Sequence, residues 1–162
     1  MKRVIPWFLL GGTLGAAAGF AVGIFVYPYI FLADIVATER LADPGSRSVV
    51  AQGRFVHANP DDPIHYGRGG VTVYDGVVHL HDDFEVGPGP AFHVYLVPEA
   101  DVTPRTSVED TMFIDLGRLR AFKGSQVYEV PAGVDLRNYA SVVIWCEHFA
   151  VLISPAALDF RT

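Results

Sequence analysis

The sequence predicts an all-β, sandwich-like domain preceded by one N-terminal transmembrane helix. Two observations lead to this fold class. Residues 4–32 contain no charged side chain, and from Ser48 onward short β-rich segments alternate with turn signals without a sustained helical period. Strands at this spacing are typical of a sandwich or barrel of about 110 residues. The predicted division is a signal-anchor helix at 1–33, a linker at 34–47 and a β domain at 48–160.

The uncharged N-terminal run is long enough to cross a membrane. At a rise of ~1.5 Å per residue, a helix over this run is longer than the ~30 Å thickness of the hydrocarbon core. Lys2 and Arg3 precede the run and Asp34 follows it, so the positive-inside rule predicts a cytoplasmic N-terminus and an extracytoplasmic β domain. A cleaved secretory signal is the alternative, because residues 16–18 are all alanine. The apolar run continues well past them, whereas the core of a signal peptide is usually ~7–15 residues, which favours an uncleaved anchor.

Glycine recurs at every fourth position of this helix, at Gly11, Gly15, Gly19 and Gly23. Such spacing forms a smooth ridge on which a second helix can pack closely. We therefore expect self-association or docking of a partner helix. The alternative is that glycine is simply common in membrane helices.

After the linker, whose clearest break is at 43–46, the turn signals separate a series of strands. Asp75-Gly76 between residues 71–74 and 77–84 is a strong hairpin signal. The other predicted strands lie at 48–57, 91–97, 113–116, 125–130 and 141–153, and residues 135–139 are compatible with one short helical turn.

The strand predicted from Ser141 to Ile153 holds the only cysteine, Cys146, beside Trp145. Both alternating faces are apolar as far as Cys146, which predicts a central strand covered on both sides. Pleating would place Cys146 and His148 on one face, where a thiol and an imidazole could share a metal, a haem or a proton. The simpler alternative is that a lone cysteine is a small buried hydrophobic residue.

Charge and motif content exclude several classes of protein. Net charge is −6 overall and becomes −8 after the anchor, where eighteen acidic and ten basic residues form no basic stripe, so we expect no nucleic-acid binding. One cysteine excludes an internal disulfide. Nucleophile elbows, His-Glu-x-x-His helices and Cys-x-x-Cys pairs are all missing, which disfavours a hydrolase.

Histidines on the predicted strands give a weaker metal-site hypothesis. His79 and His81 flank Leu80, so their rings point the same way, and His93 on the next strand would join them if the two strands pair. Three imidazoles would suit zinc or copper. The alternative is that the histidines are exposed polar residues on a solvated sheet face.

A set of short motifs, in order along the chain, resembles the DM-thirteen domain family, small extracytoplasmic modules often found beside DOMON domains. The resemblance covers roughly 50–158. The matching pieces are Gly53-Arg54-Phe55, residues 70–74, Leu80 with Phe84, Gly89-Pro90, residues 94–96, 114–117, 124–131, 135–136, and Tyr139 through 142–146 to Phe149.

The resemblance implies a β-sandwich-like domain with a redox or electron-transfer role, in which Cys146 acts as a bare thiol or as a ligand to a group such as haem. All four of His79, His81, His93 and His148 lie outside the family pattern, and His148 is a possible neighbour of Cys146 only through the alternation of the predicted strand. Any redox partner would be another protein. The alternative function is a non-catalytic binding or assembly module of the cell envelope, with the glycine ridge organising oligomers.

Overall fold

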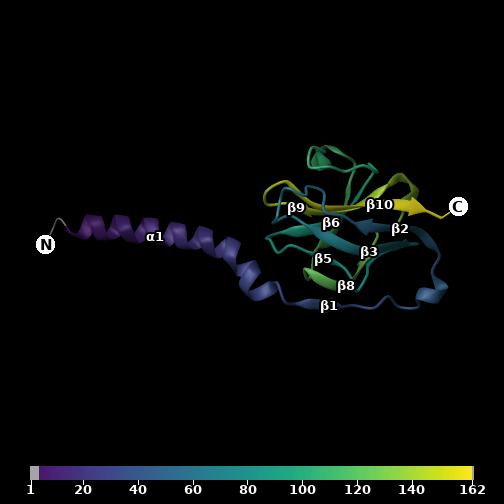
Figure 1. Cartoon of the computed structure of the whole chain (residues 1–162), viewed down its shortest axis with the longest axis horizontal. Coiled ribbons are helices and arrows are strands. Elements are labelled where there is room, and N and C mark those ends of the chain that lie inside the picture. The colour runs from purple at the N-terminus through teal and green to yellow at the C-terminus, as the bar shows by residue number, and fades with distance from the viewer. Residues whose placement is uncertain (1–3, 162) are drawn as a thin grey trace.

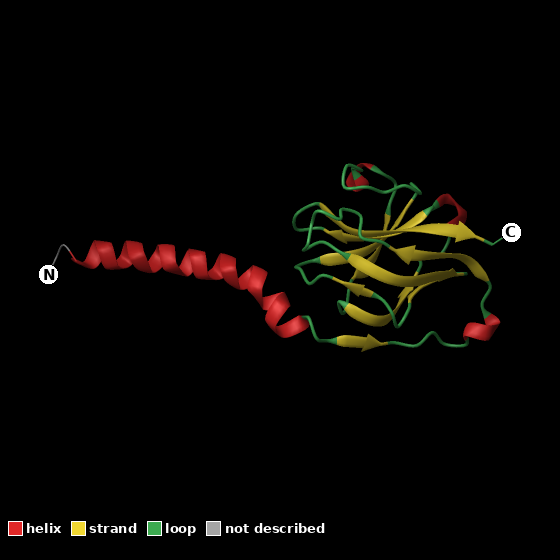
Figure 2. Ribbon diagram, viewed as in Figure 1, coloured by secondary structure: helices red, strands yellow, loops and turns green. Residues whose placement is uncertain are grey.

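The computed structural model describes residues 4–161, which form one extended helix and a β domain (Figures 1 and 2). The elements, in chain order, are α1 Val4–Tyr27, the π-helical turn η1 Pro28–Leu32, β1 Val36–Thr38, η2 Pro44–Ser46, β2 Val49–Phe55, β3 Gly67–Tyr74, β4 Val77–Leu80, β5 Glu85–Val86, β6 Phe92–Val97, η3 Val108–Asp110, β7 Ile114–Arg118, β8 Lys123–Glu129, η4 Leu136–Asn138, β9 Ser141–Cys146 and β10 Val151–Phe160. The mostly β fold and the single N-terminal apolar helix confirm the predicted fold class.

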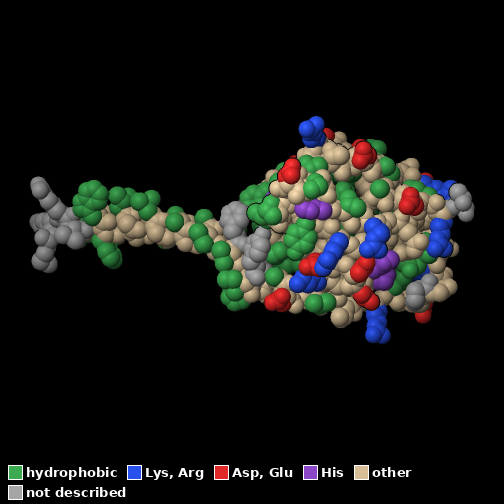
Figure 3. All heavy atoms as spheres, in the orientation of Figure 1, with side chains coloured by type: hydrophobic (Ala, Val, Ile, Leu, Met, Phe, Trp, Pro, Cys, Tyr) green, Lys and Arg blue, Asp and Glu red, His purple; other side chains and the backbone are tan. Residues whose placement is uncertain are grey.

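Helix α1 projects away from the β domain and exposes apolar side chains along its length (Figures 1 and 3). Residues 5–24 are long and apolar enough to cross a membrane, and none of that span is buried in the chain. Lys2 and Arg3, on which the predicted orientation depends, lie outside the described residues. A Cβ added at any of the four ridge glycines would meet nothing within 4 Å, so the ridge is open for a second helix and its association stays a prediction.

Nine strands follow one path in the order β1-β8-β4-β3-β2-β10-β9-β6-β7, with β5 pairing to the side with β3 and β8. The main apolar cluster draws on both halves of this path, because Val71 of β3 and Leu80 of β4 share it with Val94 of β6, Ile144 of β9 and Ile153 of β10. The sheet therefore folds over on itself in the manner of a sandwich, with its core between the two halves.

The outer face of the β6–β9–β10 half carries a second apolar cluster. Tyr95, Val143, Trp145 and Leu152 pack there beneath Val102 and Val108 of the loop that links β6 to β7. Every residue of β9 is consequently buried, and β9 lies between β6 and β10. The prediction of a central strand covered on both sides is confirmed as far as Cys146.

Two predicted segments differ from the structure. The strand predicted over 141–153 is a hairpin, since β9 ends at Cys146 and residues 147–150 form a turn into β10. The sequence pattern did not predict this turn, because residues 147–150 include neither glycine nor proline. The predicted linker contributes β1, which pairs in parallel with β8. The hairpin at Asp75-Gly76 and the helical turn near residue 136 are both confirmed.

Candidate functional site

Cys146 is the last residue of β9, and its side chain belongs to the core between the two halves of the sheet. It stands opposite Phe92 of β6 and Val151 of β10, and only 1% of the residue is exposed. The thiol donates a hydrogen bond to the carbonyl oxygen of Pro90, 3.2 Å from Sγ. The segment that precedes β6 therefore covers the sulfur.

The turn after β9 brings backbone N–H groups toward the sulfur. Burial raises the pKa of the Cys146 thiol, and this effect dominates. Hydrogen bonds from the backbone N–H groups of Phe149 and His148 act in the opposite direction, while the negative charge of Glu147 raises the pKa further. The thiol form is thus favoured at neutral pH, but the turn holds donors that would stabilise a thiolate.

His148 does not share a face with Cys146, contrary to the prediction. The strand ends before it, so the alternation on which the prediction depended no longer applies, and the His148 side chain is exposed in the turn. Its ring lies edge-to-face against Phe149, with the ring centroids 4.9 Å apart. His148 contributes its backbone N–H, rather than its imidazole, to the surroundings of the thiol.

An apolar cavity of about 650 Å³ lies where the end of α1 meets the β domain. Its lining includes Ile24 and Tyr27 of α1, Pro90 of the segment that covers the thiol, and Phe92 of β6. Among residues 4–161, neither Cys146 nor any histidine or methionine lines it. A haem ligated by Cys146 therefore does not fit this arrangement, because the sulfur is screened from the cavity by the Pro90 segment.

His79 and His81 lie side by side on the outside of the β4 region, with their ring centroids 5.5 Å apart. His79 Nε2 is 2.8 Å from the Ser125 hydroxyl, and His81 Nε2 is 2.9 Å from the Thr72 hydroxyl. Burial, followed by the neighbouring His81, lowers the pKa of His79. Both rings are thus held by hydroxyl groups of the adjacent strands.

His93 does not join the other two histidines, so the predicted three-histidine metal site is not formed. The prediction required β6 to pair with the hairpin that precedes it, whereas β6 pairs with β7 and β9. Its Nδ1 lies 3.0 Å from Asp115 Oδ2, and its Nε2 lies 3.2 Å from Glu147 Oε2. The Tyr95 hydroxyl donates to Glu147 Oε1 at 2.7 Å.

Negative charge is concentrated around this cluster of His93, Tyr95, Asp115 and Glu147. The pKa of Tyr95 is raised strongly, first by burial and then by its hydrogen bond to Glu147, with further contributions from the charges of Glu147, Asp115 and Glu109. Sequence reasoning missed Tyr95, Asp115 and Glu147 as site residues. Only the pairing of β6 with β7 and β9 brings them together, and no spacing along the chain signals that pairing.

A family model for electron-transfer DM13 domains matches residues 61–158, more than half of the chain. This chain belongs to the DM13 family. The match confirms the family that the motifs indicated and ends at the same residue, although it begins later than the resemblance did. No curated protein and no solved structure matches the chain.

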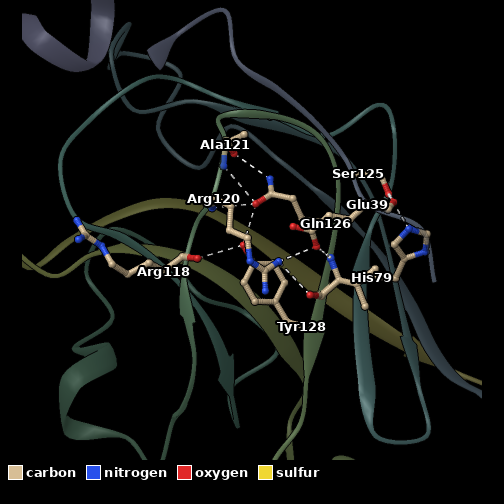
Figure 4. Close-up of polar contacts among 9 residues, drawn as sticks. Glu39, His79, Arg118, Arg120, Ala121, Ser125, Gln126 and Tyr128 are labelled. Carbon is tan, nitrogen blue, oxygen red and sulfur yellow. Dashed lines mark hydrogen bonds and ion pairs between the residues drawn. The ribbon is translucent and has the colours of Figure 1, made fainter. Parts of the chain in front are cut away.

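A buried polar network explains one stretch of the DM13-like sequence, residues 124–131. Gln126 is fully buried, and its Oε1 accepts hydrogen bonds from the Tyr128 hydroxyl at 2.8 Å and from the backbone N–H groups of Arg120 and Ala121 at 2.9 and 3.3 Å (Figure 4). Its Nε2 donates to the Ala121 carbonyl at 2.8 Å. One side chain thereby satisfies the backbone of the tight connection between β7 and β8.

The same network reaches the segment that follows α1 through Glu39. Its carboxylate accepts hydrogen bonds from Arg120 Nη1 at 2.7 Å and from the Val127 N–H at 2.9 Å, and its backbone carbonyl accepts one from the Ser125 hydroxyl (Figure 4). Arg120 also stacks over the ring of Tyr128, 4.3 Å from its centroid. The segment that follows α1 is therefore held to the DM13 domain by β1 pairing and by side-chain contacts.

Proposed function

We propose that this chain is a membrane-anchored, extracytoplasmic electron-transfer domain whose redox group is the thiol of Cys146. The DM13 match supports the general electron-transfer role. The observation that carries the assignment to Cys146 is the turn at 147–150, which directs two backbone N–H groups at the sulfur of the only cysteine. Such donors favour the thiolate, the form that reacts.

The chemistry requires a second molecule, because a chain with one cysteine cannot form an internal disulfide. A Cys146 thiolate could attack a disulfide of a partner protein, forming a mixed disulfide and releasing the partner's other sulfur as a thiolate. The sulfur must first become accessible, since the Pro90 carbonyl covers it. We propose that displacement of the Pro90 segment provides this access.

The test is the labelling rate of Cys146 by a thiol reagent across pH, using the full chain in detergent micelles and Cys146→Ser as the unlabelled control. We expect slow but measurable labelling of the folded protein, rising roughly tenfold per pH unit below the thiol pKa. Because burial raises that pKa, the rise should continue above the ordinary ~8.5. Labelling that occurs only after denaturant is added would refute the redox assignment.

Burial of Cys146 favours a second function, a non-catalytic binding or assembly module. In this case Cys146 is a core residue, and the glycine ridge of α1 mediates association. Gly15→Leu and Gly19→Leu should then abolish cross-linked oligomers of the full chain in micelles, whereas Ala17→Leu, off the ridge, should leave them intact. Monomers in every sample would exclude assembly through this helix.

Membrane anchoring is tested separately from either function. We expect the full chain to remain in the membrane fraction after alkaline extraction, because residues 5–24 are apolar and exposed. Protease added outside intact spheroplasts should digest the β domain if it is extracytoplasmic. Protection from protease would reverse the proposed orientation and leave the anchoring itself in place.

A further inference from the structure

We propose that His93, Asp115 and Glu147 form a binding site for a divalent transition-metal ion, with Zn²⁺ as the ion whose usual ligands match all three side chains. One ligand atom from each of the three residues lies within 4.8 Å of those from the other two. Imidazole nitrogen and carboxylate oxygen are both ordinary ligands of zinc. The site is distinct from the thiol, because His93 and Glu147 point to the outer face of β6 and β9 while Cys146 belongs to the inner core.

The three side chains are positioned by different elements of the fold. His93 lies on β6, Asp115 lies on β7, and Glu147 begins the turn after β9. Only 12% of the His93 side chain is exposed, against 38% and 43% for the Asp115 and Glu147 side chains. A nearly fixed imidazole is therefore flanked by two carboxylates that retain freedom to rotate. Because the carboxylates face different ring nitrogens, one of them must rotate toward the nitrogen that binds the ion.

Each carboxylate is held by a hydrogen bond to a group that would not itself ligate the ion. Glu147 Oε1 accepts from the Tyr95 hydroxyl at 2.7 Å, and Asp115 Oδ1 accepts from the Gly117 N–H at 2.7 Å. Contacts of this kind orient metal ligands and contribute to metal affinity. Each of these contacts engages one oxygen of its carboxylate, so the other oxygen, Asp115 Oδ2 or Glu147 Oε2, stays on the side of His93.

Charge complementarity supports a dication. With a neutral imidazole the cluster carries two negative charges, and within the described residues neither carboxylate has an ion-pair partner other than His93. Arg118 stands opposite His93 in the β6–β7 register, but it lines the cavity beside α1 and forms no described ion pair with either acid. A bound dication would supply the missing positive charge.

A further buried donor lies on the same face. Trp145 stands directly opposite His93 in the β6–β9 register, is 4% exposed, and its indole N–H has no hydrogen-bond partner in the described part of the chain. Three protein ligands leave a coordination position of zinc open to water or to an external donor. An indole N–H that lacks a partner on the same face is a candidate donor to the oxygen of that ligand.

The experiment is equilibrium dialysis of the untagged full chain in detergent micelles against Zn²⁺, with bound metal counted by mass spectrometry. We expect the wild type to bind one ion per chain. Loss of a group that merely orients a metal ligand typically weakens metal affinity ~10–100-fold, so loss of a ligand itself in His93→Ala or Asp115→Asn should weaken it at least ~100-fold. The His79→Ala/His81→Ala double variant, which removes two histidines outside the cluster, should bind as the wild type does. Tyr95→Phe should weaken binding about tenfold.

Three outcomes would overturn the proposal. They are no uptake of Zn²⁺ by the wild type, equal uptake by His93→Ala, or loss of the ion in the His79→Ala/His81→Ala variant. Circular dichroism of each variant separates loss of the site from loss of the fold, and Asp115→Asn provides a second, nearly isosteric test. Cys146→Ser should retain the ion, so that failure of the redox proposal and failure of the metal proposal give different results.

Discussion

Replacing Gln126 with leucine removes a buried hydrogen-bonding side chain while nearly preserving its volume. Four hydrogen bonds are lost, three to Oε1 and one from Nε2. Tyr128 keeps its contact with the Arg118 carbonyl at 3.3 Å. The backbone N–H of exposed Arg120 can turn to water, so the two backbone groups of buried Ala121 account for most of the loss.

The expected magnitude follows from those two groups. Each buried backbone group left unsatisfied costs about 1–3 kcal/mol, and the added apolar surface of leucine returns about 1 kcal/mol. Gln126→Leu should therefore lower the free energy of unfolding by roughly 1–5 kcal/mol. This is a large share of the 5–15 kcal/mol typical of a folded domain.

The assay is urea unfolding of the full chain in micelles, followed by the fluorescence of buried Trp145 in a Trp7→Phe background. The matched control is Gln52→Leu, because Gln52 is exposed on β2 and its two side-chain hydrogen bonds are longer than 3.1 Å. Its substitution should change the unfolding free energy by only about 0.5 kcal/mol. Equal effects of the two substitutions would refute the reasoning.

Three further predictions use the same unfolding assay or limited proteolysis. Gly124→Ala should expose residues 33–47 to protease, because the glycine has a φ of +88° and an added Cβ would collide with β1. The control is Gly133→Ala, because Gly133 has a similar φ of +86° but open space around it, so the difference between the two variants reports the collision. Stability should fall as pH decreases below 6.5, because the lowered pKa of His79 in the folded protein means that the unfolded state binds the proton first. His79→Gln should reduce this dependence of the unfolding free energy on pH. Cys146→Ala should cost only on the order of 1 kcal/mol, so a complete loss of electron transfer with that small a cost would mark a functional thiol.

Patterns confined to one strand or one turn were sufficient to predict much of the fold. The apolar run of α1, the Asp75-Gly76 hairpin and the burial of β9 on both faces all follow from local sequence. The turn after Cys146 was missed because it carries no turn-forming glycine or proline, and Ala150 adopts its φ of +50° instead. Because the turn was missed, the sequence pattern predicted His148 as a site residue, whereas the structure places its side chain in solvent.

The cluster around His93 could not be predicted because it depends on long-range pairing. Asp115 lies 22 residues from His93 in sequence, and Tyr95 lies 52 residues from Glu147. The order of strands in a sheet is set by how both of their faces are covered, and this chain offers no local signal for it. The motif 124–131 was similarly visible as a pattern, while the role of Gln126 required the backbone geometry of the connection before β8.

Glu147 connects the two proposals, because it follows Cys146 directly and also belongs to the metal cluster. Its negative charge raises the pKa of the thiol, so neutralising it in Glu147→Gln should lower that pKa and speed labelling of Cys146 at neutral pH. The amide oxygen of glutamine can still accept the hydrogen bond from the Tyr95 hydroxyl, which keeps the turn in place. Asp115→Asn removes a carboxylate of the same cluster, and Asp115 is not one of the groups that act on the thiol pKa, so this variant should weaken metal binding alone. If the two variants changed labelling equally, the thiol would be responding to the cluster as a whole, and the Glu147 charge beside the sulfur would not be the cause.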